Sequence, residues 1–185
     1  MSLKLVILDR DGVINQDSAD FIKKPEEFLP LQGSLEAISR LNQAGILVAV
    51  ATNQSGLARK YFSEATLKNI HQYLQELLKQ HGGHIDAIYY CPHGPDDNCK
   101  CRKPKPGLIE DILAHFKLQE HLDKVVIIGD SWRDIEAARA AGCEALLVKT
   151  GNGAKTAQLH AHEFRTEEIF FDLAHAVETL LRINP

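Results

Sequence analysis

Short apolar segments alternate along the chain with longer segments whose apolar residues recur at helical spacing. The apolar segments are rich in β-branched residues and almost free of polar positions, which is typical of parallel strands covered on both faces. The longer segments are bounded by residues that cap helices, such as Ser63 before the second and Gly142 after the fourth. The predicted strands are 3–9, 46–52, 85–91, 124–129, 145–148 and an edge strand at 169–171. The predicted helices are 34–44, 63–81, 106–116, 131–141 and 174–183.

Strands that alternate with helices over short connections predict an α/β fold with three layers. We expect a Rossmann-like parallel sheet with helices on both faces. The length of 185 residues suits one core, so residues 1–185 are predicted to form a single domain. Ligands bind such sheets at the carboxyl ends of the strands. Asp9, Thr52 and Asp130 each end a predicted strand and should therefore lie close together.

Charge and composition narrow the class of partner. The formal charge of -4 gives no electrostatic basis for binding nucleic acid, which needs clustered Lys and Arg. No apolar run is long enough to span a membrane, and the N-terminal residues show no export signal. We therefore expect a soluble, cytoplasmic, monomeric protein whose partner is a small molecule.

Two carboxylates follow the first predicted strand and suggest phosphoryl transfer. Asp9 and Asp11 flank Arg10, so in extended backbone they point the same way, about 7 Å apart. One carboxylate can attack phosphorus while the other protonates the departing oxygen and then activates water. Attack by an anion on an anion needs a cation, and Mg²⁺ held by carboxylates supplies one, with Asp130 as a further ligand. Thr52 can add a hydrogen bond to the phosphoryl group.

Each of these features has a simpler explanation when it is taken alone. An Asp-x-Asp sequence is often a turn or a pair of solvated carboxylates, and Thr52-Asn53 can be a helix cap. Lys103 can be a surface charge, and Gly129-Asp130 can be a turn. Their joint occurrence at successive strand ends favours a phosphoryl-transfer site.

A loop without hydrophobic periodicity, residues 91–103, carries a separate group of ligands. Cys91, His93, Cys99 and Cys101 supply three thiols and one imidazole, which suits a closed tetrahedral Zn²⁺ site. The alternative is a buried strand-end cysteine beside an ordinary loop histidine, which leaves two reactive thiols exposed. A zinc ion would order the loop, so that Arg102 and Lys103 point toward the phosphate.

The motifs together resemble the haloacid dehalogenase-like (HAD-like) hydrolases. The resemblance rests on Asp9-Arg10-Asp11-Gly12, Thr52-Asn53-Gln54-Ser55-Gly56, Lys103-Pro104 and Gly129-Asp130. It implies that Asp9 is the nucleophile, that Asp11 is the general acid and base, and that Thr52 and Lys103 stabilise the phosphoryl group. It also implies an Mg²⁺ ion held by Asp9, Asp130 and the backbone carbonyl of Asp11, with Asp134 as a supporting carboxylate.

Within that family, the segments 89–93 and 101–104 resemble the phosphatases of D-glycero-D-manno-heptose 1,7-bisphosphate, which act in lipopolysaccharide precursor synthesis. Histidinol-phosphate phosphatases are similar in the same segments. The resemblance implies a sugar bisphosphate substrate and removal of its 7-phosphate. It also implies substrate contacts from Arg10, Asp17, Asp20, Asn53, Gln54, Ser55, Arg102 and Ser131. Residues 15–30 and 56–63 are too short for a large cap domain.

Two other functions remain open from the sequence. The same chemistry could act on histidinol phosphate or on another small phosphomonoester. A zinc-stabilised binding module without catalysis is the alternative outside the enzymes. The complete set of Asp9, Asp11, Thr52, Lys103 and Asp130 argues against it, because a binding module does not need two carboxylates beside a phosphate.

Overall fold

The computed structural model describes residues 2–183, which form one parallel sheet covered by helices on both faces. The strands are β1 (Leu5–Leu8), β2 (Leu47–Asn53), β3 (Ala87–Cys91), β4 (Val125–Gly129), β5 (Glu144–Val148) and β6 (Ile169–Phe170). The α-helices are α1 (Ser34–Gln43), α2 (Glu64–Gln80), α3 (Gly107–Phe116), α4 (Trp132–Ala140), α5 (Gly153–Leu159) and α6 (Leu173–Ile183). Short 3-10 helices lie at Pro25–Glu27, Leu122–Lys124, Ala161–Glu163 and Thr166–Glu168.

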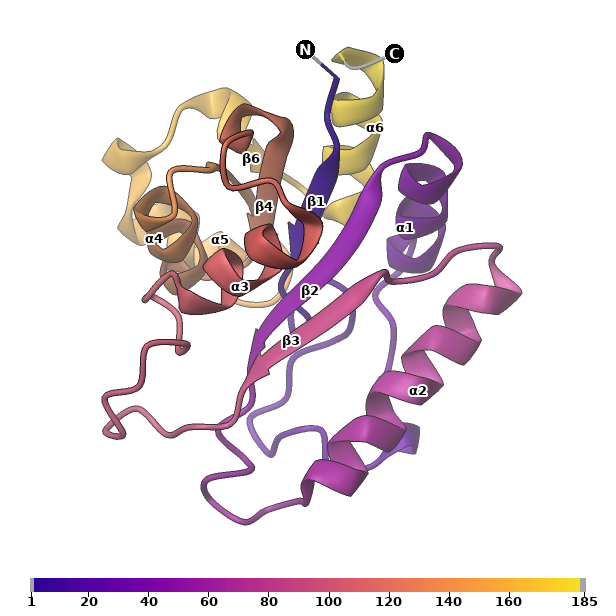
Figure 1. Cartoon of the computed structure of the whole chain (residues 1–185), viewed down its shortest axis with the longest axis vertical. Coiled ribbons are helices and arrows are strands. Elements are labelled where there is room, and N and C mark those ends of the chain that lie inside the picture. Colours follow the sequence, from indigo (N-terminus) through magenta and orange to yellow (C-terminus); the bar gives the residue numbers. More distant parts are fainter. Residues whose placement is uncertain (1, 184–185) are drawn as a thin grey trace.

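The strand order is β3-β2-β1-β4-β5-β6, and every neighbouring pair is parallel. Figure 1 shows α1 and α2 on one side of the strands, with α3 and α4 on the other. Helix α6 packs beside α1. The predicted three-layer architecture is therefore confirmed.

The alternation of side chains along β1 explains the two cores. Val6 and Leu8 pack under α1, α2 and α6, whereas Leu5 and Ile7 pack under α3 and α4. All four side chains are fully buried because both faces of the strand are covered. A continuous apolar run is therefore what a central strand of this sheet requires.

Every strand and helix predicted from periodicity is present, with bounds that differ by at most two residues. The predicted cap at Ser63 is confirmed, since its side chain accepts a hydrogen bond from the backbone N–H of Thr66. Helix α5 was not predicted. Only Gly153 and Thr156 are buried in it, so its sequence has no apolar stripe to indicate a helix.

The loops at the carboxyl ends of the strands carry no large cap. In residues 15–30 the longest helical element is the 3-10 turn Pro25–Glu27, and residues 56–63 contain turns only. None of the helices within residues 2–183 combines the length and the apolar character that a membrane span requires.

Candidate active site

The carboxyl ends of β1, β2 and β4 converge on one buried lysine. Lys103 reaches in from the loop after β3, and its Nζ lies 3.0 Å from Asp9 Oδ1 and 2.6 Å from Asp134 Oδ1. It also donates to the backbone carbonyl of Ala51 at 2.6 Å. The side chain is only 4% exposed. Burial acts to lower the pKa of Lys103, but Asp134 and Asp9 raise it well above its ordinary value, so the ammonium stays charged.

Three carboxylates surround this position. Oxygens of Asp9, Asp130 and Asp134 all lie within 4.8 Å of one another. Burial raises the pKa of Asp9 to about 8 and that of Asp130 to about 6. Burial also acts to raise the pKa of Asp134, but Lys103 and the hydrogen bonds from Lys103 and Ser131 outweigh it and lower the pKa.

These carboxylates fit a divalent cation. A buried group of three carboxylates balanced by one ammonium carries an excess of negative charge, and the charges of Asp134 and Asp130 add to the effect of burial in raising the pKa of Asp9. A cation among the three oxygens would compensate it. An oxygen-only donor set with few protein ligands is what Mg²⁺ prefers.

Asp130 is fixed by the turn that begins α5. Its Oδ2 accepts hydrogen bonds from the backbone N of Asn152 at 2.7 Å and from Asn152 Nδ2 at 3.2 Å. Asn152 Nδ2 also donates to Asp17 Oδ2 at 3.1 Å. Two glycines with positive φ, Gly12 and Gly151, press against the same carboxylate, and a Cβ on either would lie 2.2 Å from Asp130 Oδ2. Oδ2 of Asp130 is thus held in place by Asn152 and enclosed by the two glycines.

Asp11 lies outside the group of three carboxylates and has its own set of donors. Its carboxylate accepts hydrogen bonds from Arg10, from Asn15 Nδ2 at 2.9 Å and from Gln54 Nε2 at 3.0 Å. Burial acts to raise the pKa of Asp11, but the charge of Arg10 and these hydrogen bonds lower it. The carboxylate is therefore held in its ionised form.

A cavity opens over these side chains. Of the predicted site residues, those that line it are Asp9, Arg10, Asp11, Asp17, Thr52, Asn53, Gln54, Ser55, Arg102, Lys103, Asp130, Ser131 and Asp134. Asp20 does not line it and instead lines a neighbouring hollow with Lys23 and Glu26. Asp17 lines both the cavity and this hollow, and the predicted contact of Asp20 with substrate stays a prediction. The side chain of Asp20 is exposed, and its backbone N–H donates to Ser18 Oγ at 3.2 Å.

Several side chains that were predicted to contact substrate form hydrogen bonds or ion pairs with other residues of the protein. Gln54 Nε2 donates to both Asp11 and Thr52, and Ser131 Oγ donates to Asp134 Oδ2 at 2.6 Å. The Arg10 guanidinium is buried against Asp11. These three side chains line the cavity but chiefly hold other residues of the site.

The cavity also contains residues that sequence reasoning missed. Phe21, Arg133 and Asn152 line it. Asn152 follows β5 and could have been found by the same strand-end rule that found Asp9 and Asp130. No motif pointed to Phe21 or Arg133.

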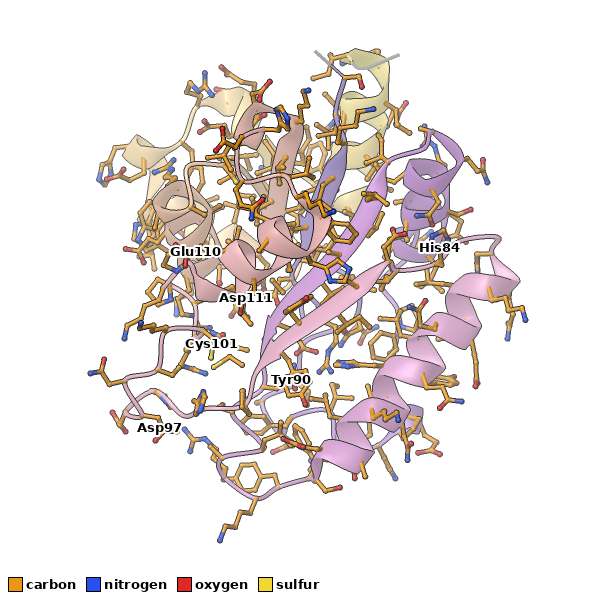
Figure 2. All side chains as sticks on the ribbon, viewed as in Figure 1. His84, Tyr90, Asp97, Cys101, Glu110 and Asp111 are labelled. Carbon is orange, nitrogen blue, oxygen red and sulfur yellow. The ribbon has the colours of Figure 1, made fainter. Side chains whose placement is uncertain are left out.

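The predicted thiol and imidazole ligands come together in the loop after β3. Sγ of Cys101 lies 3.2 Å from that of Cys91 and 3.6 Å from that of Cys99, and His93 Nδ1 lies 3.4 Å from Cys101 Sγ. A tetrahedral zinc site with Zn–S bonds of about 2.3 Å has S···S edges near 3.8 Å, so this packing suits a zinc ion. Burial and the neighbouring thiols raise the pKa of Cys91 to about 12, which a bound cation would reverse. Figure 2 shows Cys101 beside the carboxyl end of β3, with Asp97 at the outer end of the loop.

The same loop delivers Lys103 to the carboxylates. Arg102 is tied to the thiol cluster, because its backbone N–H donates to Cys99 Sγ and its Nη1 donates to the carbonyl of His93 at 3.1 Å. Lys103 then exchanges hydrogen bonds with the Asn53 side chain, both at 3.1 Å. The position of Lys103 thus depends on the thiol cluster on one side and on β2 on the other.

Comparisons with known proteins agree with this geometry. A HAD-hydrolase-like family model matches residues 100–176. The D-glycero-beta-D-manno-heptose-1,7-bisphosphate 7-phosphatase of Pseudomonas aeruginosa is 51% identical over 182 residues, which are 98% of this chain and 100% of that protein. The enzyme of the same name from Bordetella bronchiseptica is 56% identical over 154 residues, 83% of this chain and 85% of that protein. The chain belongs to this phosphatase family.

A solved structure of the family extends the agreement to the fold. The crystal structure of the D,D-heptose 1,7-bisphosphate phosphatase from B. bronchiseptica, complexed with magnesium and phosphate, superposes with a TM-score of 0.90. It is 51% identical, and the match covers 98% of this chain and 99% of that one. The predicted resemblance to HAD-like hydrolases is therefore confirmed. The predicted HAD-like fold is confirmed as well.

Proposed function

We propose that this chain is a Mg²⁺-dependent phosphatase that removes the 7-phosphate of D-glycero-β-D-manno-heptose 1,7-bisphosphate. It is a phosphoric monoester hydrolase of the HAD-like family. The observation that carries the proposal is the meeting of Asp9, Asp130 and Asp134 around Lys103 at the strand ends. The names of relatives at about half identity supply the substrate.

Asp9 is the nucleophile in this proposal. Its carboxylate oxygen attacks phosphorus, the bond from phosphorus to the sugar oxygen breaks, and an aspartyl-phosphate forms. Lys103, already paired with Asp9, and the hydroxyl of Thr52 stabilise the negative charge that develops on the phosphoryl oxygens. Mg²⁺ held by Asp9, Asp130 and the backbone carbonyl of Asp11 neutralises the repulsion between the two anions when it is bound.

Asp11 moves the protons. It protonates the departing sugar oxygen and then takes a proton from the water that attacks the aspartyl-phosphate, which restores Asp9 and releases phosphate. The hydrogen bonds around Asp11 favour the ionised form that accepts a proton. A bound phosphate ester adds negative charge nearby, which raises the pKa of Asp11 and favours the protonated form needed in the first step.

We propose further that Cys91, His93, Cys99 and Cys101 bind a structural Zn²⁺ ion. The support is their close packing and the donor set of three thiols and one imidazole. The single domain, residues 1–185, would then contain a zinc-ordered loop at 91–103. We place the reaction in lipopolysaccharide precursor synthesis in the cytoplasm, carried out by a monomer on a soluble sugar phosphate.

Arg102 and the cavity wall suit a second anionic group on the substrate. Arg102 and Arg133 both line the cavity beside Lys103, and no carboxylate pairs with either of them among the described contacts. Asp17, Asn53 and Ser55 can hydrogen-bond the sugar hydroxyls. We therefore expect a sugar bisphosphate to be preferred over a monoester.

A substrate panel tests this function. Phosphate release is measured with Mg²⁺ for heptose 1,7-bisphosphate, histidinol phosphate and p-nitrophenyl phosphate, and kcat/KM is compared. We expect the heptose bisphosphate to exceed the others by at least about tenfold, because only it offers a second phosphate to Arg102. A higher kcat/KM for histidinol phosphate would instead assign the chain to that activity, and no release from any ester would favour a binding module.

A further inference from the structure

The guanidinium of Arg10 forms hydrogen bonds with two partners. Its Nε and Nη2 donate to the carboxylate of Asp11, at 3.2 Å and 2.9 Å. Its Nη1 faces the other way and lies 3.3 Å from Nε2 of His71. The Arg10 side chain is 1% exposed, so water does not replace either partner.

His71 comes from the middle of α2 and is not among the residues that line the cavity. It lies 61 residues from Arg10 along the chain and is 9% exposed. Every N–H of a guanidinium is a donor, so Nη1 donates and His71 Nε2 accepts. The imidazole proton must then reside on Nδ1.

A neutral acceptor suits this place better than a charged one. A carboxylate at position 71 would attract the guanidinium and compete with Asp11 for it. Burial, with the positive charge of Arg10 added, lowers the pKa of His71 to about 3. The imidazole is therefore neutral at physiological pH and can accept the hydrogen bond without drawing Arg10 away from Asp11.

We propose that His71 is a positioning residue of the phosphatase reaction, which fixes the Arg10 guanidinium so that Arg10 in turn orients the carboxylate of Asp11. This inference rests on the proposed role of Asp11 in proton transfer. Arg10 follows the nucleophile Asp9 directly in the chain and is bonded to the carboxylate of Asp11, the proposed proton donor. A rotation of the Arg10 side chain would therefore move that carboxylate relative to the phosphoryl group. A displacement of this kind is expected to slow the chemical step more than it weakens substrate binding.

The test compares His71→Leu, which removes the acceptor, with His71→Gln, which offers a carbonyl oxygen at similar reach. We expect His71→Leu to lower kcat on heptose 1,7-bisphosphate about tenfold, a part of the 10²–10⁴ that general acid–base catalysis contributes, with KM changed less than about twofold. His71→Gln should recover most of the rate. His115→Leu is the matched control, because its imidazole bonds Tyr89 on the surface, away from the cavity. Its kcat should equal that of the parent.

The same substitution in a second variant, Asp11→Asn, distinguishes a positioning role of His71 from a general loss of structure. In Asp11→Asn, where proton transfer is already lost, adding His71→Leu should lower the single-turnover rate no further. An equal loss in both backgrounds would show that His71 acts only on folding and would overturn the proposal. An unchanged kcat in His71→Leu would overturn it as well.

A measurement on the unaltered protein covers the case in which His71→Leu does not fold. Nitrogen-15 NMR of the histidines, assigned by comparison with His71→Gln, should show the His71 proton on Nδ1 and no titration between pH 5 and 8. A proton on Nε2 would contradict the inference, since two donors would then face each other. Failure of the proposed function itself has a different signature, namely parental turnover in Asp9→Asn.

Discussion

The two ligand clusters of this molecule are built in opposite ways. The carboxylate cluster takes Asp9 from the end of β1, Asp130 from the end of β4 and Asp134 from the first turn of α4, so it exists only when distant parts of the chain have folded together. The thiol cluster takes all its ligands from residues 91–101, and a metal alone can gather them. The first cluster is suited to chemistry because it borders an open cavity, and the second is suited to ordering a loop. Lys103 connects the two.

The largest effect is expected from Asp9→Asn. An amide cannot form the aspartyl-phosphate, so turnover should fall by at least about 10³-fold in a phosphate-release assay with Mg²⁺. Zinc content, measured by mass spectrometry, should stay at the parental value because the thiol cluster does not depend on Asp9. Loss of zinc in this variant would show that the thiol cluster depends on the carboxylate cluster.

A smaller effect is expected from Cys99→Ser, which removes one thiol. Zinc content should fall, and kcat/KM should drop by about 10- to 100-fold because Arg102 and Lys103 lose their anchor, as is typical when a supporting shell is removed. Cys143→Ala is the matched control, since Cys143 is buried beside α4 and lies outside the cluster. Equal rates in Cys99→Ser and the parent would break the proposed link between the clusters.

Asn152→Ala tests whether the carboxylate cluster can be altered without any effect on the thiol cluster. Removal of the amide that donates to Asp130 should weaken Mg²⁺ binding about tenfold in calorimetric titration, because ligands lose orientation when an outer partner is removed. Zinc content should not change. Asn42→Ala, which removes the acceptor of the His84 backbone N–H far from the cavity, should leave Mg²⁺ affinity at the parental value.

The smallest effect is expected outside both clusters. Ser63→Ala removes the N-cap of α2 and should lower the free energy of unfolding by about 1 kcal/mol. Urea denaturation measures this loss. Metal content and kcat should be unchanged, and a change in either would mean that α2 contributes to the site through more than His71.

The sequence predicted the parts of this fold that depend on local patterns. Apolar runs and helical periodicity located every strand and five of the α-helices, because each buries an apolar face. Helix α5 was missed, since it is short and buries little, and with it the contact of Asn152 with Asp130.

The sequence also predicted the strand-end residues and the thiol cluster, but not how the side chains pair. The pairing of Arg10 with His71 joins residues that are far apart in the chain, and nothing in the pattern of α2 distinguishes His71 from other inward helix positions. The family resemblance implied substrate contacts from both Asp17 and Asp20. Both line the neighbouring hollow, but of the two only Asp17 also lines the cavity over the carboxylates.

The two glycines beside Asp130 set a limit on redesign. Any side chain at Gly12 or Gly151 would overlap the carboxylate at 2.2 Å, so these positions cannot be varied in a library that seeks new substrates. Phe21, which is half-buried, and Arg133, which is exposed, also line the cavity and have no such restriction. Libraries that vary Phe21 and Arg133 should therefore yield folded variants with altered substrate preferences. Libraries that vary Gly12 and Gly151 should yield inactive variants.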